Sequence, residues 1–298
     1  IHTGNQIRAG AALFKWDYEY FYSMPEFDIV LYLQNNLNDV QWDLISKSPR
    51  LNDELKWDRT LYNYYRWIRN VNSVLEKIYY LWNFFELSKL ESINSYSEIL
   101  AIRTSEWDWG YLTEHSLVFN KGKYFESAFK KFKAFIDFRG LSARQGTGVT
   151  QDLIANYVDA DWDWVALANN TSIEFDIKFI KEQSSRHWDW QALAARTDIK
   201  LDNASLFDLI DKDWDWQSIS SCESLTFDET CIMRLLNKPM DWFVVSQNNS
   251  FSPNQNTLSL LKGKNLDWDS ISSNSKLDVS VLWDYKDNLN WRNVTRNK

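Results

Sequence analysis

A bulky apolar residue, an acid and a tryptophan recur with a fixed period along the second half of the chain. The tryptophan, which we call the marker, stands at intervals of 26 residues at Trp164, Trp190, Trp216, Trp242 and Trp268. The windows around these markers read WDWVALA, WDWQALA, WDWQSIS, MDWFVVS and LDWDSIS, and a shortened sixth window, LNWRNVT, contains Trp291. Such a period indicates a repeat protein whose small units bury their apolar faces by stacking on one another.

Each window has the features of a helix start. The Asp before the marker, once replaced by Asn, is a preferred N-cap, whose side chain accepts hydrogen bonds from the free amides of the first turn. The apolar residue before the cap and the aliphatic residue four positions after it fit a hydrophobic staple. The staple pairs are Trp162 with Leu167, Trp188 with Leu193, Trp214 with Ile219, Met240 with Val245, and Leu266 with Ile271. Met and Leu can replace the first tryptophan, so this position requires bulk, and we interpret the motif as structural.

A second helix start follows in every unit. Twelve residues after the marker stands another residue of N-capping type: Asp176, Asp202, Asp228, Asn254 and Ser280. Four positions after the first four of these comes an aliphatic residue: Ile180, Leu206, Ile232 and Leu258. We therefore predict two short helices per unit, with a tight turn between them. The small residue that ends the first motif, such as Ala168 or Ser220, lets the neighbouring helix approach closely.

Weaker copies of the window extend toward the N-terminus at irregular intervals. An aromatic residue occupies the marker's place in each: Tyr18, Trp42, Phe84, Trp109 and Phe138. Residues 61–90 are rich in aromatic residues and predict one long helix where a unit should be. The predicted fold is all-α: an α-solenoid of short helix pairs, regular from about residue 150 to 298 and irregular before. We expect an irregular helical region over 1–139, a Gly-containing hinge over 140–150 and regular repeats over 151–298.

Composition agrees with a helical globular protein. The 298 residues are 44% hydrophobic and 25% charged, and only 8 Gly and 4 Pro interrupt the helical segments. No apolar run reaches the roughly 20 residues that span a bilayer, so we expect no membrane insertion. The two Cys are too few for a disulfide framework, which favours a reducing, cytoplasmic compartment, and with three His they form no zinc pattern. The chain lacks an initiator Met and a signal sequence, so we expect it to begin inside a longer polypeptide or after a removed tag.

The repeated windows resemble the tandem LDWxxLS helical repeats found in some bacterial and large-DNA-virus proteins. The resemblance extends from Tyr18 to Trp291 and is close in the last six units. It implies a helical scaffold or recognition segment, commonly part of a larger chain. It transfers no catalytic residue, because the motif positions are caps and core.

Candidate catalytic groups have simpler structural explanations. Asp163 and Asp215 are N-caps, and their neighbours Asp161 and Asp213 fall on a turn surface, without the converging titratable partners that acid/base chemistry needs. The segment RQGTGVTQ at 144–151 resembles a phosphate loop, but it lacks the third Gly of a dinucleotide fingerprint and any Gly-Lys-Ser/Thr motif. We predict no catalytic, cofactor-binding or metal-binding residues, no cofactor, and a non-enzymatic protein.

One segment of the chain is basic. Its cations outnumber Glu126 and Asp137 and are the candidate partner-binding residues: Lys121, Lys123, Lys130, Lys131, Lys133, Arg139 and Arg144. Phenylalanines from Phe125 to Phe138 interleave with them at spacings of three and four, which places them on one helical face. The segment is either a core stripe with a solvated face or a site for an acidic or nucleic-acid partner, with lysines neutralising phosphates.

The sequence favours a binding or scaffold function. The recurring positions are caps and core, whereas positions 165, 191, 217 and 243 carry different side chains that a partner can read. We expect the partner to be a protein or another domain of the parent chain. Two alternatives stay open: nucleic-acid recognition through residues 121–144 in a multidomain nucleic-acid-handling system, and a glycan-binding or glycan-processing helical protein. The net charge of −8 disfavours contact with a phosphate backbone, except at a local basic patch.

Overall fold

The regular structure is helical, as the repeat pattern predicts. The computed structural model describes residues 23–24, 41–48, 83–89 and 104–296. Within these ranges the regular elements are helices, without a strand, and an isolated antiparallel bridge pairs Asn120 with Thr147. The chain divides into two compact units, residues 1–149 and residues 150–298, which are described separately below.

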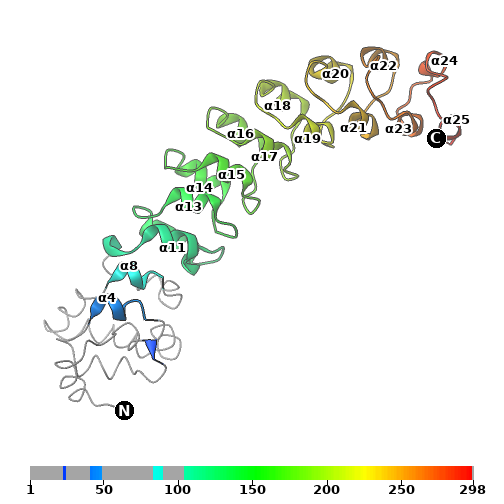
Figure 1. The fold of residues 1–298 in the computed structure, drawn as a ribbon. Coiled ribbons are helices and arrows are strands. Elements are labelled where there is room, and N and C mark those ends of the chain that lie inside the picture. The colour runs from blue at the N-terminus through cyan, green and yellow to red at the C-terminus, as the bar shows by residue number, and fades with distance from the viewer. Residues whose placement is uncertain (1–22, 25–40, 49–82, 90–103, 297–298) are drawn as a thin grey trace, which may run out of the picture. The chain divides into compact units, whose positions relative to one another are not determined.

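In the unit of residues 150–298, each repeat consists of two short helices. The first helices begin at the markers: α15 (Trp164–Asn169), α17 (Trp190–Ala194), α19 (Trp216–Ser220), α21 (Trp242–Gln247), α23 (Trp268–Ser273) and α25 (Trp291–Val294). The second helices are α14 (Gln151–Asn156), α16 (Ile177–Glu182), α18 (Asn203–Asp208), α20 (Glu229–Leu235), α22 (Gln255–Leu260) and α24 (Val281–Asp284). First helices of consecutive repeats pack against one another in one row, and α16 to α24 form a second row beside it (Figure 1). This arrangement is the predicted array of helix pairs.

The Asp before each marker caps the first helix, as predicted. The Asp163 carboxylate accepts a hydrogen bond from Ala166 N (2.9 Å), and the Asp189 carboxylate accepts one from Ala192 N (3.0 Å). Second helices are capped in the same way; the Asp176 carboxylate, for example, accepts from the backbone amide three residues later. Each such cap stabilises its helix by about 1 kcal/mol.

The staple positions form the core of the array. Both members of every first-helix pair are buried, from Leu167 at 0% exposure to Leu266 at 9%. The aliphatic residues of the second helices, such as Ile180 and Leu258, are at most 1% exposed. Burial of each such side chain stabilises the fold by about 1.5–3 kcal/mol. Because helices this short are marginal in isolation, packing between repeats holds them.

Tryptophan at the first staple position adds a hydrogen bond to its bulk. The indole N–H of Trp188 donates to Gln183 O at 3.0 Å, at the C-terminal end of the preceding second helix. Trp214 makes the same contact with Leu209 O at 2.9 Å. Met240 has no such donor, but it is also buried, at 8% exposure, so a bulky side chain is sufficient for packing at this position.

The last repeat departs from the predicted pattern. Ser280 adopts helical backbone angles (φ −58°, ψ −27°) and makes no side-chain capping bond, so its predicted role as an N-cap is wrong. The interval from Trp268 to Trp291 is 23 residues instead of 26, which changes the register of α24. Val281, ten residues before Trp291, is 0% exposed and takes the place of Leu258, ten residues before Trp268.

The unit of residues 1–149 contains the weaker copies. Its described helices are α4 (Trp42–Ile45), α8 (Phe84–Leu87), α11 (Trp109–His115), α12 (Phe125–Phe132) and α13 (Phe138–Ala143), with 3-10 turns at Thr104–Glu106 and Leu117–Phe119. Four of these helices begin at the residue in the marker's place, which confirms these copies as helix starts. The copy at Tyr18 lies outside the described residues.

The prediction of one long helix over residues 61–90 is wrong at its C-terminal end. Asn83 has extended backbone angles (φ −84°, ψ 93°), and its side chain accepts a hydrogen bond from Glu86 N at 3.1 Å. This N-cap starts a new helix, α8, which ends at Leu87. The capping bond therefore overrides the aromatic pattern here, and residues 61–82 lie outside the described part of the chain.

The predicted hinge segment 140–150 is hydrogen-bonded within its unit. Gly140 lies inside α13, and Gly148 N donates to Phe119 O at 3.4 Å. Any side chain at Gly148 would collide with the ring of Phe125, so this glycine permits a close approach. A hinge motion here stays a prediction.

Candidate binding surface

The hydroxyl four residues after the marker joins one repeat to the next. Asp241 N, at the cap of one repeat, donates to Ser220 Oγ of the preceding repeat at 2.9 Å. The same bond occurs in the unit of residues 1–149, where Asp108 N donates to Ser88 Oγ at 2.9 Å. The small residue of the motif is therefore more than a spacer where it is serine, because it satisfies a backbone amide of its neighbour.

The cation four residues before the marker also reaches back to the preceding repeat. Lys212 Nζ lies 5.2 Å from the ring centroid of Trp190 and donates to Ser184 O at 2.8 Å. Lys238 lies 5.1 Å from the ring centroid of Trp216 in the same manner. A cation over an aromatic face stabilises by about 0.5–1 kcal/mol at exposed sites and more when buried. These cations thus hold repeats together.

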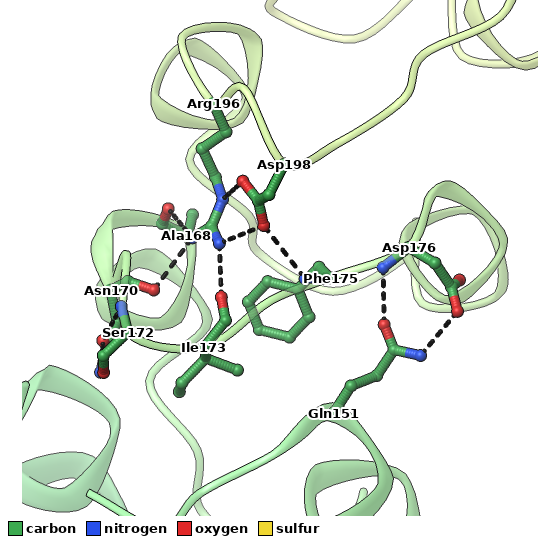
Figure 2. A network of polar contacts seen from close by, with 9 residues as sticks. All are labelled: Gln151, Ala168, Asn170, Ser172, Ile173, Phe175, Asp176, Arg196 and Asp198. Atoms are coloured by element: carbon green, nitrogen blue, oxygen red, sulfur yellow. Dashed lines mark hydrogen bonds and ion pairs between the residues drawn. The ribbon is translucent and has the colours of Figure 1, made fainter. Parts of the chain in front are cut away.

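Arg196, six residues after its marker, also contacts the preceding repeat, that of Trp164 (Figure 2). Its side chain is 4% exposed and pairs with Asp198 at 2.7 Å. The guanidinium donates to three carbonyls of the preceding repeat: Ala168 O at 3.1 Å, Asn170 O at 3.0 Å, and Ile173 O. One planar guanidinium therefore satisfies the backbone carbonyls of the turn between two helices, because Arg carries several donors in a fixed fork.

The second helices are joined by a side-chain amide. The Gln151 amide donates to Asp176 Oδ2 at 2.8 Å, and its oxygen accepts from Asp176 N at 2.7 Å (Figure 2). The Gln151 bond, followed by that of the Phe179 amide, lowers the pKa of the Asp176 carboxyl. A carboxylate held this way stays ionised at neutral pH and serves the fold.

Three positions around each first helix lie at the surface, and we call them together the array edge. They are the residues three before, one after and five after each marker from Trp164 to Trp268, and every one of them is exposed. The residues three before the marker are Asp161, His187, Asp213, Pro239 and Asn265. The residues one after it are Val165, Gln191, Gln217, Phe243 and Asp269. The array edge is thus exposed and chemically varied.

Contacts between repeats show that the array edge is continuous. The side-chain amide of Asn169 donates to Asp189 Oδ2 at 3.0 Å, and that of Gln247 donates to Asp267 Oδ2 at 2.8 Å. Each of these bonds joins the residue five after one marker to the N-cap of the next repeat. Equivalent positions of consecutive repeats therefore lie side by side along the row of first helices.

Two shallow hollows occupy equivalent places on the array edge. One, of about 410 Å³, is lined by His187, Trp190 and Asp213, among others. The other, of about 280 Å³, lies two repeats further along, beside Trp242 and Phe243. Open hollows repeated along a row fit contacts with an extended partner better than enclosure of one small molecule.

The basic segment, residues 121–144, lies in the other unit and contains helices α12 and α13. On this helix Phe125, Phe129 and Phe132 are at most 3% exposed, so the core-stripe interpretation holds for them. α12 ends at Phe132, and Phe138 begins the next helix, so the aromatic residues do not share one helix as the spacing indicated. The exposed candidate cations are Lys121, Lys123, Lys130, Lys131, Lys133 and Arg139.

Arg144 is placed differently from the other six candidates. Its half-buried guanidinium donates to Thr113 O at 2.7 Å and to Ser116 O at 2.8 Å, and burial lowers its pKa. It stands six residues after Phe138, as Arg196 does after Trp190. Arg144 therefore has the same structural role as Arg196: it donates hydrogen bonds to backbone carbonyls of a preceding segment.

Metal-ligating and thiol side chains also occur within the described part of the chain. Among the described residues, no group of three His, Cys, Asp or Glu side chains is placed to hold a metal ion. Burial raises the pKa of the Cys231 thiol to about 12, so it is a buried, unreactive thiol at neutral pH. In the same part of the chain, no helix has the length and apolar character needed to cross a bilayer.

Comparison with protein-family models, with curated proteins and with solved structures gave no match for this chain. The resemblance to LDWxxLS repeats therefore stays a prediction. What the structure itself defines is a class: an α-helical repeat array with tryptophan-marked helix pairs and a continuous, varied edge.

Sequence reasoning missed the contacts that join repeats. A signal was present, because the residue four before four consecutive markers is basic: Arg186, Lys212, Lys238 and Lys264. A recurring charge in an otherwise variable stretch indicates a structural partner. That partner belongs to the preceding repeat, so the residue's own window does not reveal it.

Proposed function

We propose that residues 150–298 are a non-enzymatic binding or scaffold segment that presents the array edge to a macromolecular partner. The partner is a protein or another domain of the same polypeptide. One observation carries the proposal: recurring side chains are used in caps, core and joints between repeats, whereas the exposed edge positions differ from repeat to repeat. Helical repeat arrays characteristically recognise partners through such extended surfaces.

The proposal is tested by site-specific photo-crosslinking in extracts of the source cells. A photoreactive residue is placed at Gln191, Gln217 or Phe243 on the array edge, and at Lys178 or Arg234 on the second helices as matched controls. All five positions are exposed. We expect one and the same polypeptide to be crosslinked from the three edge positions and not from the two controls.

The same variants are checked for unchanged thermal unfolding, so that a loss of crosslinking is not a loss of fold. Equal crosslinking from the second helices, or none from the edge of the folded protein, contradicts the proposal. An intracellular setting is part of it, supported by the two free thiols Cys222 and Cys231.

Nucleic-acid binding by the basic segment is a second candidate function. The observation that favours it is Tyr124, which is 68% exposed next to Lys123, whose Nζ lies 4.7 Å from its ring centroid. An exposed aromatic ring with adjacent lysines can stack on a base while the cations neutralise phosphates. The glycan alternative stays a prediction.

This candidate is tested by fluorescence anisotropy with short duplex and single-stranded nucleic acids at two salt concentrations. We expect salt-sensitive binding that is lost when Lys130, Lys131 and Lys133 are changed to Gln. Tyr124→Ala should weaken single-strand binding alone, by about tenfold, because stacking contributes about 1–3 kcal/mol per base. Absence of binding at low salt removes the candidate.

A further inference from the structure

The net charge of the molecule belongs to one unit. Residues 150–298 contain 23 Asp and Glu against 15 Lys and Arg, a net charge of −8, whereas residues 1–149 contain 18 of each. The regular repeats therefore carry the whole net charge of the chain. A surface of one sign attracts partners of the opposite sign and speeds their association.

The array edge concentrates this charge. Its 15 positions include Asp161, Asp213 and Asp269 and no Lys or Arg. The capping Asp residues stand between these positions and are half-buried. Hydrogen bonds from the Ala192 amide and from Asn169 lower the pKa of the Asp189 carboxyl, so this cap stays ionised.

Three cations of the same repeats are engaged between repeats. Lys212 and Lys238 reach back over marker rings and donate to carbonyls of the preceding repeat, Ser184 O and Ile210 O. Arg196 is 4% exposed and donates to carbonyls. These three cations therefore stabilise the joints between repeats, and the edge positions themselves supply carboxylates and no cation.

Apolar groups stand among these acceptors. Phe243 is 39% exposed and Val165 is 38% exposed, both on the array edge. The hollow beside Phe243 is lined by Asp241 and Trp242 as well. A Lys or Arg side chain matches this combination, because its methylene stem packs on a ring while its charged end meets a carboxylate or an aromatic face.

We propose that the array edge docks an extended, Lys/Arg-rich polypeptide segment, with successive cationic side chains received at successive repeats. The inference rests on the proposed function, since it names the chemistry of the partner that this edge receives. An extended segment fits because equivalent edge positions lie side by side along the row, as the Asn169–Asp189 bond shows. Nucleic acid does not fit this edge, since ionised carboxylates repel phosphates.

The test is a fluorescence titration of the full chain with a labelled peptide of Lys and Arg residues separated by Gly and Ser. A peptide with Glu in place of the cations and a single-stranded oligonucleotide serve as comparison ligands. The edge variant combines Asp161→Asn, Asp213→Asn and Asp269→Asn, which removes charge but keeps an acceptor oxygen. The matched control, Glu182→Gln with Asp208→Asn and Glu229→Gln, removes the same charge from the second helices.

We expect the Lys/Arg peptide to bind in a salt-sensitive manner and the other two ligands not to bind the edge. The edge variant should weaken binding about tenfold, since each lost surface pair contributes about 0.2–1 kcal/mol, and the control should change it less than about twofold. Equal weakening by both variants overturns the inference, because the attraction then reflects overall charge alone.

Failure of this inference differs from failure of the proposed function. If the Lys/Arg peptide does not bind while photo-crosslinking from Gln191, Gln217 and Phe243 still captures one partner, the edge is a docking surface for another chemistry. If binding of the Glu peptide or the oligonucleotide depends on the edge carboxylates, the assigned partner chemistry is wrong. If the edge positions yield no crosslinks either, the proposed function itself is overturned.

Discussion

Single hydroxyl groups fix the spacing between neighbouring repeats. Asp267 N donates to Ser246 Oγ at 2.8 Å, and this hydroxyl donates in turn to Phe243 O at 2.7 Å. Ser246 is buried, at 1% exposure. Ser246→Ala removes this acceptor and leaves the partly buried amide of Asp267 without a partner at that site. We expect a loss of about 1–3 kcal/mol in the free energy of unfolding, measured by urea titration.

The repeats that carry alanine at this place provide the converse experiment. Ala168, 1% exposed, stands four residues after its marker as Ser246 does. Ala168→Ser should stabilise the protein by about 0.5–1.5 kcal/mol by adding the missing acceptor. A neutral Ser246→Ala together with a destabilising Ala168→Ser shows that size alone matters there.

The buried cation Arg196 contributes more to the stability of the fold than an exposed charge such as Lys178. Arg196→Met removes the partner of Asp198 and the donors to three carbonyls at once, whereas Met keeps most of the volume. We expect a loss of about 3–5 kcal/mol, because the carbonyls of the buried residues Ala168, Asn170 and Ile173 lose their donor and each unsatisfied buried acceptor costs about 1–3 kcal/mol. Lys178→Met is the control: Lys178 is 84% exposed in a 3.9 Å pair, and its loss should cost less than about 0.5 kcal/mol. Similar values for both variants contradict the structural role of Arg196.

The helices themselves were predictable from sequence to the extent that their signals are local. The Asp189 cap and its acceptor relation to Ala192 lie within one window, and so does the staple of Trp188 with Leu193. The helix start at Asn83 was indicated by the weaker copy at Phe84, but the aromatic-rich pattern of residues 61–90 predicted a helix running through it. The candidate surface was predictable at positions 165, 191, 217 and 243 and at Asp161 and Asp213. The joints were not, since the groups that Lys212 and Arg196 contact lie a repeat away.

Helix α24 shows how a change of register exposes an apolar surface. The interval before Trp291 is three residues shorter, so Val281 enters the core while Val279 and Trp283 are 77% and 82% exposed. We expect Val281→Ala to cost about 2 kcal/mol, as for other core truncations. Trp283→Ser should change the free energy of unfolding by less than about 0.5 kcal/mol. A large loss with Trp283→Ser would show that α24 keeps the register of the other second helices.

Acid acts on the whole unit of residues 150–298, because the same capping chemistry recurs in each repeat. The Gln151 amide lowers the pKa of Asp176, and the Ala192 amide lowers that of Asp189. A carboxyl whose pKa is lower in the folded than in the unfolded state contributes stability above the unfolded value. That contribution is lost as the pH falls through the folded value. The unfolded value is about 3.9.

We therefore expect the free energy of unfolding to stay nearly constant from about pH 7 to 5 and to fall below about pH 4. Protonation also relieves repulsion within the unit's net charge of −8, which acts in the opposite direction, but salt screens exposed charges and leaves capping bonds intact. Urea titrations followed by tryptophan fluorescence at several pH values and at physiological salt measure the balance. Asp189→Asn, which keeps a capping oxygen without a titrating carboxyl, should make the fall shallower. Stability that rises steadily from pH 5 to pH 3 shows that charge repulsion, and not the caps, sets the acid response.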